Sequence, residues 1–475
     1  MKKKILIGLS LFGAAAMSIT ACGNKESSKT GTARAVEEAS KMTLAQLAEA
    51  SKKEWEKDPN GTMNVVGLTS VLRSVATSIA EKYEWLDYTY DKTTKTSTGN
   101  ISVNNSYKDY QLLAVLPQAE NTYFADYALA QDVRSFSTLM EDGITHNFVP
   151  SDTSAVGLPE VGKTPLYGVH FNKLFWTNTN FEHVNGFRLY NIWQVAGTSA
   201  DHDHCDKVSF QSPTTEQINM SFLLTAYAEE NQARIEAAYK SFYGKDWEPT
   251  TFKDGNITNT YRSAGDQWVR EFIANISRFH TSDGTAMKQT QLRDDWNEGY
   301  VYYGAFAKMK DAVGNTFNVD LDGNGAVEAK AYSVECGGVT YNYASEENIN
   351  AMTTVKWDWA IEGFNGFMYC MDSQIINNAR YPYTACLFAR TMLEEDVYTN
   401  AIYNAGTPDA TGAAANQYGY YYPGQTSADF KYAKGDWTKE QHTEKELNED
   451  YEYLKNVKIS SVNTILMLVN SNKKA

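Results

Sequence analysis

Short apolar segments that alternate with amphipathic segments constrain the fold of this chain more than any other feature. Residues 63–67 form a short apolar run, and residues 71–79 then carry apolar side chains at helical spacing. The first pattern is typical of a buried strand and the second of an amphipathic helix. The same order recurs along the chain, which predicts further strands at residues 110–116, 166–169, 174–178 and 207–210, and helices at residues 43–55, 124–140, 215–226, 229–242, 264–279 and 383–393. Strands that alternate with helices of this length predict an α/β fold with largely parallel sheets.

The first 22 residues have the layout of a secretory signal. Three lysines precede an apolar run of about 15 residues, which ends in small residues just before Cys22. The run is shorter than the roughly 20 apolar residues of a membrane-spanning helix. A cysteine at this position resembles a bacterial lipobox, in which the thiol is acylated and the leader removed; an ordinary signal peptide with an incidental cysteine is the alternative. The resemblance predicts an exported protein that is anchored through Cys22 to the outer face of the cell membrane, with residues 1–21 removed and residues 22–41 as a flexible tether.

The charge balance of the chain excludes some classes of partner. The 475 residues carry a net charge of −15 at pH 7, and three of the lysines belong to the leader. Nucleic acids and anionic membrane surfaces bind proteins through basic patches, so an acidic chain argues against both. The length suits two or three domains. Four cysteines besides Cys22 are too few for a disulfide scaffold, and we expect buried free thiols at Cys205, Cys336, Cys370 and Cys386.

Several segments, taken in order, resemble the extracellular solute-binding proteins of bacterial ABC importers. They are residues 65–70 (VVGLTS), 140–150 (MEDGITHNFVP), 165–175 (PLYGVHFNKLF), 210–216 (FQSPTTE) and 378–388 (NARYPYTACLF). The first is similar to that family's opening strand and ligand-facing loop, and the third to the strands that cross between its two lobes. The last is similar to its stretch of small residues and a proline before a helix near the hinge. The ferric-ion and thiamine binders are the branch for comparison, although this chain is longer and its residues 313–343 have no counterpart there.

This resemblance implies a two-lobed periplasmic-binding-protein-like α/β fold, in which hinge-linked lobes close a cleft over a small polar solute. The implied division is a first lobe at residues 42–165, most of the second lobe at 166–310, a β-rich insertion at 311–345, and the hinge return with the C-terminal helices and loops at 346–475. Hinge strands are expected near residues 175–178 and 363–367. Permease subunits of an ABC transporter are the implied protein partners.

Hydroxyl-rich turns after two predicted strands are candidates for the ligand site. In open α/β sheets, ligands bind beyond the carboxyl ends of the strands and often against helix N-termini. Simple N-capping of the following helices is the alternative role for such side chains. Together with the family resemblance, these turns lead us to expect solute contacts from Thr69, Ser70, Ser212, Thr214, Thr215 and Glu216. We also expect solute contacts from Phe364 and Asn365, in the expected hinge segment at residues 363–367.

Two motifs contain residues of the kinds that bind metals. Residues 201–205 (DHDHC) hold zinc-type ligands, but contiguous residues on a strand alternate sides and cannot all reach one ion, so a solvated loop is favoured. Asp320, Asp322 and Asn324 resemble the start of a calcium-binding loop. Ala331 stands where such a loop needs a bidentate carboxylate, which favours a hairpin turn and leaves weak calcium binding as the alternative. No cofactor is expected.

The adjacent tyrosines at residues 420–422 resemble those that hold iron in ferric binders, but they lie in a glycine-rich segment, where a packing role is favoured. No nucleophile elbow, phosphate loop or zinc-protease helix occurs in the sequence. The hypothesis is therefore a lipid-anchored, non-enzymatic substrate-binding protein of an ABC transporter. The alternative is a surface-anchored carbohydrate-active enzyme or glycan-binding lipoprotein, although no pair of acids is fixed at the separation that glycoside hydrolysis requires.

Overall fold

The computed structural model describes most of the chain between residues 31 and 472. The described residues are 31–67, 71–91, 93–105, 112, 115–117, 122–131, 133–158, 162–178, 187–197, 202–205, 207–254, 256–291, 301–305, 333–336, 339–342, 355–357, 360–399, 420–421 and 445–472. Cys22, Thr69 and Ser70 lie outside them, as do Asp320, Asp322 and Asn324. The predictions made for these six residues therefore stay predictions.

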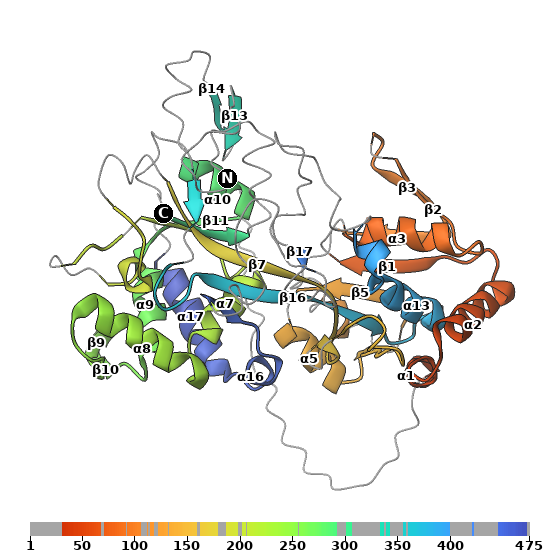
Figure 1. Ribbon diagram of the computed structural model, residues 1–475, viewed down its shortest axis with the longest axis horizontal. Coiled ribbons are helices and arrows are strands. Elements are labelled where there is room, and N and C mark those ends of the chain that lie inside the picture. The colour runs from red at the N-terminus through yellow and green to blue at the C-terminus, as the bar shows by residue number, and fades with distance from the viewer. Residues whose placement is uncertain are drawn as a thin grey trace, which may run out of the picture.

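Helices and strands alternate as the sequence predicts (Figure 1). The helices are α1 (Gly31–Ala39), α2 (Leu44–Lys57), α3 (Val71–Lys82), α5 (Val133–Glu141), α7 (Gln217–Thr225), α8 (Glu229–Tyr243), α9 (Ala264–Asn275), α10 (Asp283–Gln291), α13 (Pro382–Met392), α14 (Glu395–Val397), α16 (Tyr451–Lys455) and α17 (Ile459–Ser471), with a 3-10 helix at Ile192–Val195. The strands are β1 (Met63–Gly67), β2 (Tyr88–Asp91), β3 (Thr96–Gly99), β4 (Ile101–Asn104), β5 (Tyr127–Ala130), β6 (Thr145–His146), β7 (Leu166–Asn178), β8 (Val208–Gln211), β9 (Thr251–Asp254), β10 (Ile257–Thr260), β11 (Ile276–His280), β12 (Val301–Ala305), β13 (Ser333–Cys336), β14 (Val339–Asn342), β15 (Val355–Trp357), β16 (Gly366–Ile376), β17 (Tyr420–Tyr421) and β18 (Glu446–Asn448).

One large sheet runs through the whole molecule. Its strand order is β11-β8-β12-β7-β16-β5-β1-β4, with β15 and β17 also paired to β7, and β6 and β18 paired to β16. The strands β1, β4 and β5 are mutually parallel on one side, and β8, β11 and β12 are parallel on the other. The molecule therefore has two α/β halves, which we call the first lobe (β4, β1, β5) and the second lobe (β12, β8, β11).

Two long antiparallel strands, β7 and β16, connect the lobes, and Figure 1 shows both crossing the molecule. The first lobe attaches where β5 pairs with residues 372–375 of β16. The second lobe attaches where β12 pairs with residues 173–177 of β7. The part of the crossing that pairs with neither β5 nor β12 therefore lies around residues 168–172 of β7, where β17 pairs with His170 and Phe171. It is displaced by several residues from the segment 175–178 at which the sequence placed a hinge, because that segment is already paired within the second lobe.

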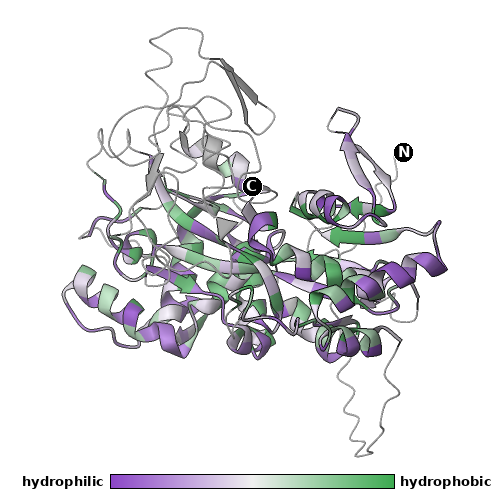
Figure 2. Cartoon of the chain, turned by 45° about the vertical axis from the view of Figure 1, so that its right-hand side comes forward, coloured by the Kyte–Doolittle hydropathy of each residue, from purple (hydrophilic) through white to green (hydrophobic). Residues whose placement is uncertain are grey.

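Hydrophobic side chains fill the space between the sheet and its helices. In Figure 2 the hydrophobic residues concentrate along the strands, while the peripheral helices carry many hydrophilic residues. Phe222 of α7 lies at the centre of the second lobe, where its ring stacks on Tyr303 with centroids 4.2 Å apart and also contacts Phe175. In the first lobe Tyr127 packs on Phe388 of α13. Cys205, Cys370 and Cys386 are free thiols, and the first and last are buried.

Residues 22–41 were expected to form a tether, and the structure corrects this for residues 31–39. They form α1, in which Ala35, Val36 and Ala39 are buried against the rest of the first lobe. Alanine at two of these positions hides the amphipathic pattern, because its small side chain gives a weak hydrophobic signal. Within the described residues, no helix is long and apolar enough to span a membrane.

Three other boundaries differ from the sequence-based expectation. Positions 112 and 115 are helical rather than part of a strand, and residues 127–130 form the buried strand β5 inside a segment that we predicted as helix. Residues 276–280 form the strand β11 directly after α9, so the expected helix 264–279 ends early. β5 is fully buried and β11 is buried only at its two ends, and both are too short to show a clear alternation of apolar and polar side chains.

Candidate functional site

The carboxyl ends of the strands in the two lobes point toward each other. β5 runs antiparallel to β16, from Tyr127 opposite Ile375 to Ala130 opposite Asp372, and therefore ends toward the crossing. β12 runs antiparallel to β7 and ends with Ala305 opposite Lys173, so it approaches the crossing from the other lobe. The parallel neighbours β1, β8 and β11 share these directions. This is the edge at which α/β sheets bind ligands.

The turn between β8 and α7 carries four of the residues that the sequence singled out. Ser212 Oγ and Thr214 Oγ1 lie 2.8 Å apart, and the Thr215 hydroxyl donates to the Ser212 carbonyl oxygen at 3.1 Å. Glu216 is the N-cap residue of α7, and its side chain makes no capping hydrogen bond. Thus none of the three hydroxyls caps α7, and Thr214, Thr215 and Glu216 are all partly exposed beside its first turn.

A side-chain contact between lobes shows that the two helix N-termini meet. Arg134, in the first turn of α5, donates from Nη2 to Oε1 of Gln217, the first residue of α7, over 2.8 Å. α5 follows β5 in the first lobe and α7 follows β8 in the second. The N-terminus of a helix carries a partial positive charge, because its first backbone N–H groups have no carbonyl partner within the helix itself. Arg134 adds a full positive charge at the point where they converge.

A buried ion pair lies beneath this meeting point. Lys173 Nζ of β7 is 3.1 Å from Oδ2 of Asp283, the first residue of α10, and donates to Oδ1 of Asn219 on α7 at 2.8 Å. The Lys173 side chain is 2 % exposed and that of Asp283 is 9 % exposed. Asn219 in turn donates to the Gln211 carbonyl at the end of β8. These contacts tie the crossing strand β7 to the two helices that begin at the candidate site.

Phe364 and Asn365, also expected to contact a ligand, lie just before β16. Phe364 is fully buried, and its ring packs edge-on against Trp268 at 4.9 Å, so the structure places it in the core of the second lobe. Asn365 is fully buried as well, and neither its amide oxygen nor its amide nitrogen has a hydrogen-bond partner among the described residues. The backbone carbonyl of Asn365 accepts a hydrogen bond from the Phe175 N–H, and its own N–H donates to the Lys445 carbonyl.

The described part of residues 201–205 packs beside α8. The rings of His202 and His204 are 6.4 Å apart and perpendicular, and each lies against Phe242 and Tyr243. Among the described residues, no group of three or more His, Cys, Asp or Glu side chains is arranged to hold a metal. Aromatic packing is the role that these contacts support for the two histidines.

Sequence reasoning missed Arg134, Gln217, Lys173 and Asp283. Lys173 gave a signal that could have been used, because it and Asn172 are the only polar residues in the segment 171–176, and Lys173 is the charged one. A lysine in the middle of a buried strand needs a partner charge, and such pairs mark sites of constraint. Arg134 gave no comparable signal, because the strand before it was assigned to a helix.

Burial and the nearby Arg278 lower the pKa of His280, at the end of β11, from 6.5 to about 4. Between about pH 6.5 and pH 4 the unfolded chain therefore binds a proton that the folded chain does not, and the folded state loses stability as the pH falls. We expect a loss of about 2–3 kcal/mol from this residue between pH 7 and 4.5. Urea unfolding of the parent and of His280→Gln at both pH values measures it, because the variant should lose less stability on acidification. Equal losses in both proteins would contradict the assignment.

Comparison with known proteins yields matches of structure but not of sequence. No protein-family model matches the chain, and no curated protein matches it. Among solved structures it is similar to the periplasmic binding protein AfuA from Actinobacillus pleuropneumoniae, with exogenous fructose-6-phosphate bound, at 11% identity and a TM-score of 0.50, covering 86% of this chain and 99% of that one. It is similar to apo ferric ion-binding protein A of Pasteurella haemolytica at 10% identity and a TM-score of 0.50, covering 87% of this chain and 98% of that one. The chain thus has the two-lobed periplasmic-binding-protein-like α/β fold.

Proposed function

We propose that this chain is the substrate-binding protein of an ABC importer and captures a small polar solute between its two lobes. The observation that carries the proposal is the 2.8 Å contact between Arg134 and Gln217, which joins the first turns of α5 and α7 across the lobes. A solute seated there touches both lobes at once. Contacts to both lobes favour the closed form, because only that form makes them together.

The same geometry favours a solute with an anionic group. Two helix N-termini and a guanidinium form a local positive field, which is the arrangement that binds phosphate and carboxylate groups. The partly exposed hydroxyls of Thr214 and Thr215 would supply neutral hydrogen bonds. Of the ligands named for the two structural neighbours, fructose-6-phosphate fits these groups better than a bare ferric ion, which needs several anionic ligands of its own.

The lipobox at Cys22 supports a lipid anchor on the outer face of the membrane, and permease subunits are the proposed partners. Lipid attachment keeps a binding protein close to a membrane-embedded transporter, and the tether is then no longer than residues 22–30, because α1 begins at Gly31. The intact mass of the protein extracted from membranes tests the anchor. An N-terminus that is neither cleaved at residue 22 nor acylated would exclude it.

Solute binding can be tested with the ligands of the neighbours and with glycans. Sugar phosphates, ferric ion and an oligosaccharide panel are first screened by thermal shift, and any binder is then followed by small-angle scattering. We expect an anionic solute to make the protein more compact. Arg134→Gln should weaken its affinity at least tenfold, because a hydrogen bond to a charged group contributes about 1.5–3 kcal/mol.

The matched control is Lys253→Gln, in the β9–β10 hairpin of the second lobe, which removes the same charge away from the crossing. It should bind with the parent affinity. Full affinity in Arg134→Gln, or compaction with none of the solutes, would remove the proposed site. Turnover of an oligosaccharide would instead favour the carbohydrate-active alternative.

A further inference from the structure

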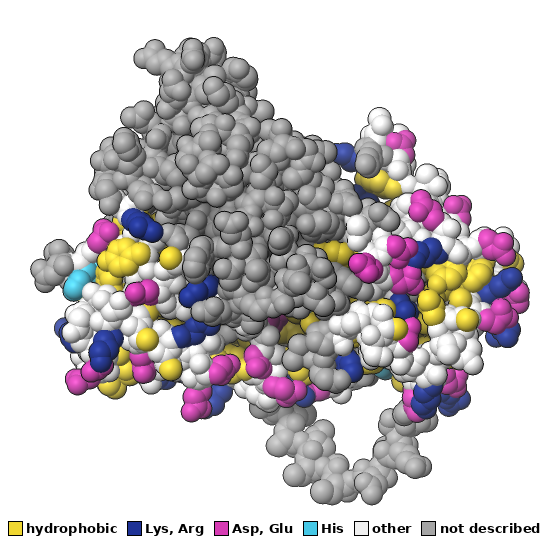
Figure 3. Space-filling model, in the orientation of Figure 1, with side chains coloured by type: hydrophobic (Ala, Val, Ile, Leu, Met, Phe, Trp, Pro, Cys, Tyr) yellow, Lys and Arg dark blue, Asp and Glu magenta, His cyan; other side chains and the backbone are white. Residues whose placement is uncertain are grey.

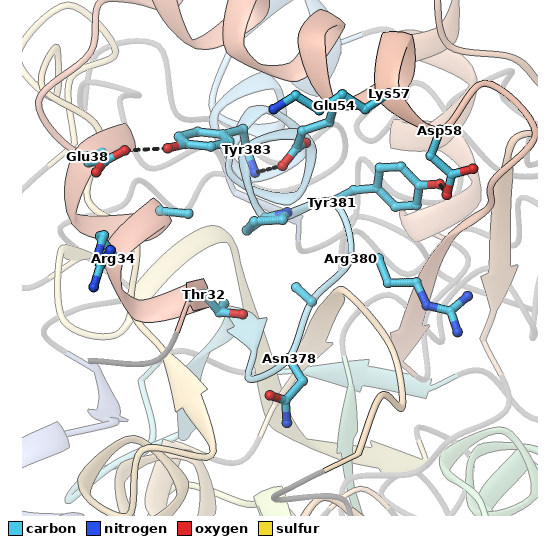
Figure 4. Close-up of a pocket in the computed structure, with 14 residues that line it drawn as sticks. Thr32, Arg34, Glu38, Glu54, Lys57, Asp58, Asn378, Arg380, Tyr381 and Tyr383 are labelled. Carbon is cyan, nitrogen blue, oxygen red and sulfur yellow. Dashed lines mark hydrogen bonds between the residues drawn. The ribbon is translucent and has the colours of Figure 1, made fainter. Parts of the chain in front are cut away.

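A cavity lies in the first lobe, at the end that is remote from the crossing (Figure 4). Its volume is about 600 Å³, which is within the range of small-molecule sites. The walls come from α1, the C-terminal turn of α2 and the loop at residues 378–383, which leads from β16 into α13. This loop is held at the start of β5 by Asp126, whereas the candidate ligand site lies beyond the end of β5. The two sites are therefore distinct.

The acidic side chains of this cavity are all engaged by neighbouring donors. The Tyr381 hydroxyl donates to Asp58 at 2.7 Å, and the Tyr383 hydroxyl donates to Glu38. Glu54 accepts hydrogen bonds from the backbone N–H of Tyr383 at 2.9 Å and of Thr384 at 2.8 Å, and so caps α13. Burial raises the pKa of Glu54 from 4.5 to about 7, which reduces its negative charge at neutral pH.

The basic side chains of the cavity, unlike the acidic ones, are not paired with an oppositely charged or hydrogen-bonding side chain among the described residues. Arg34, Lys57 and Arg380 line it, and Figure 4 shows them on different sides. Among the described residues, none of the three forms an ion pair with a carboxylate; the Arg380 guanidinium instead lies 3.9 Å from the ring centroid of Tyr123. Elsewhere on the face drawn in Figure 3, acidic and basic side chains lie close together over both lobes. Among its described lining residues the cavity therefore holds three cations that form no ion pair, while its carboxylates accept hydrogen bonds from tyrosine hydroxyls or backbone N–H groups.

The loop that forms its floor also has an unusual backbone. Asn378 has a φ of +59°, in the left-handed region that residues other than glycine seldom adopt. Such conformations cost about 1–3 kcal/mol and persist where the surrounding structure imposes them, often at ligand sites. Here Asp126 accepts hydrogen bonds from the N–H groups of both Arg380 and Tyr381, which fixes the loop beside the cavity. The cavity is thus rigid on the side from which Arg380 projects.

We propose that this cavity binds a small anion with more than one charged group, such as a diphosphate or a polycarboxylate. Cations on several sides suit a ligand whose charges are spread over several positions better than one with a single charge. The partly exposed ring of Tyr383 also lines the cavity and provides apolar contact for the body of the ligand, whereas the ring of Tyr381 is buried against Trp55. The proposal does not depend on the interlobe site.

Pyrophosphate and citrate are the probes, titrated calorimetrically into the full-length protein, with inorganic phosphate as the singly phosphorylated comparison. We expect pyrophosphate or citrate to bind more tightly than inorganic phosphate, and the affinity to fall as salt is added. Each of Arg34→Gln, Lys57→Gln and Arg380→Gln should weaken binding roughly 3- to 10-fold, and the triple variant at least 30-fold, on the basis of one lost charged contact per substitution.

The controls are Lys41→Gln and Lys53→Gln, whose lysines lie just after α1 and on α2 but pair with Glu37 and Glu49. Both should bind as the parent does. Binding of neither probe, or undiminished binding by the triple variant, would overturn the proposal. Binding that is lost in Arg134→Gln but kept in the triple variant would assign the anion to the interlobe site, which overturns this proposal and leaves the proposed function standing.

Discussion

Replacing Lys173 with methionine should lower the free energy of unfolding by about 3–5 kcal/mol, which is the cost of removing one partner from a buried ion pair. The Lys173 ammonium is 3.1 Å from the Asp283 carboxylate, and both side chains are nearly inaccessible to solvent. Methionine preserves the volume of the lysine stem but leaves Asp283 without its counter-ion. Urea unfolding of Lys173→Met, compared with the parent at pH 7, measures the loss. The double variant Lys173→Met with Asp283→Leu should be more stable than the single variant, because it removes the unpaired charge as well.

The pair formed by Lys240 and Asp246 is the matched control. Its nitrogen–oxygen distance of 2.8 Å is shorter than that of the buried pair, but its side chains are 64% and 79% exposed. Surface pairs contribute little, because water and salt screen both charges. Lys240→Met should therefore leave the unfolding midpoint nearly unchanged. If the two substitutions had similar effects, burial would not be the reason for the stabilisation at Lys173.

Asp126→Ala should also destabilise the protein strongly, by on the order of 4 kcal/mol. This fully buried carboxylate accepts from the backbone N–H groups of Arg380 at 2.6 Å, Tyr381 at 3.0 Å and Asn64 at 2.8 Å, and from the Tyr123 hydroxyl at 2.8 Å. Removing it leaves several buried donors without an acceptor. Chemical denaturation measures the loss, and hydrogen exchange of the amides of Arg380 and Tyr381 should quicken.

Two further variants define what Asp126 contributes. Asp126→Asn keeps one acceptor oxygen but turns an NH₂ group toward backbone donors, so its stability should lie between those of the parent and the alanine variant. Asp142→Ala removes an exposed carboxylate from the turn after α5 and should have little effect. An alanine variant at position 126 as stable as Asp142→Ala would mean that water replaces the carboxylate at no cost.

Elements with strong local signals could be predicted from the sequence. Thr43 was expected to cap a helix, and it does so as part of a capping box with Gln46 at the start of α2. The α8 helix begins at Glu229 as predicted and ends one residue beyond the expected boundary, where Gly244 adopts a left-handed conformation. These are features of one continuous segment, so the chain displays them without any tertiary information. β5 and β11, by contrast, owe their conformation to the strands beside them in the sheet.

The candidate site divides in the same way. The hydroxyls of Ser212, Thr214 and Thr215 were found because they follow a recognisable strand, and they do lie at its carboxyl end. The roles of Arg134 and Lys173, by contrast, depend on partners that are 83 and 110 residues away in the chain. A pattern within one segment cannot reveal which distant residue completes it. Solute contact by Thr69 and Ser70, which lie outside the described residues, stays a prediction.

The pairing of β7 with β16 also has a consequence for how this chain acquires its structure. Leu166 is opposite Ser373, and Ser51 of α2 contacts Thr384 of α13 at a separation of 333 residues. The N-terminal half therefore cannot complete its sheet or cover its helices until the C-terminal half has been synthesised. Contacts at such separations slow folding, because the intervening chain must first be brought together. A chain whose sheet can be completed only after its last segments are synthesised remains unfolded for longer. An unfolded polypeptide is also the form that can pass through a narrow protein channel.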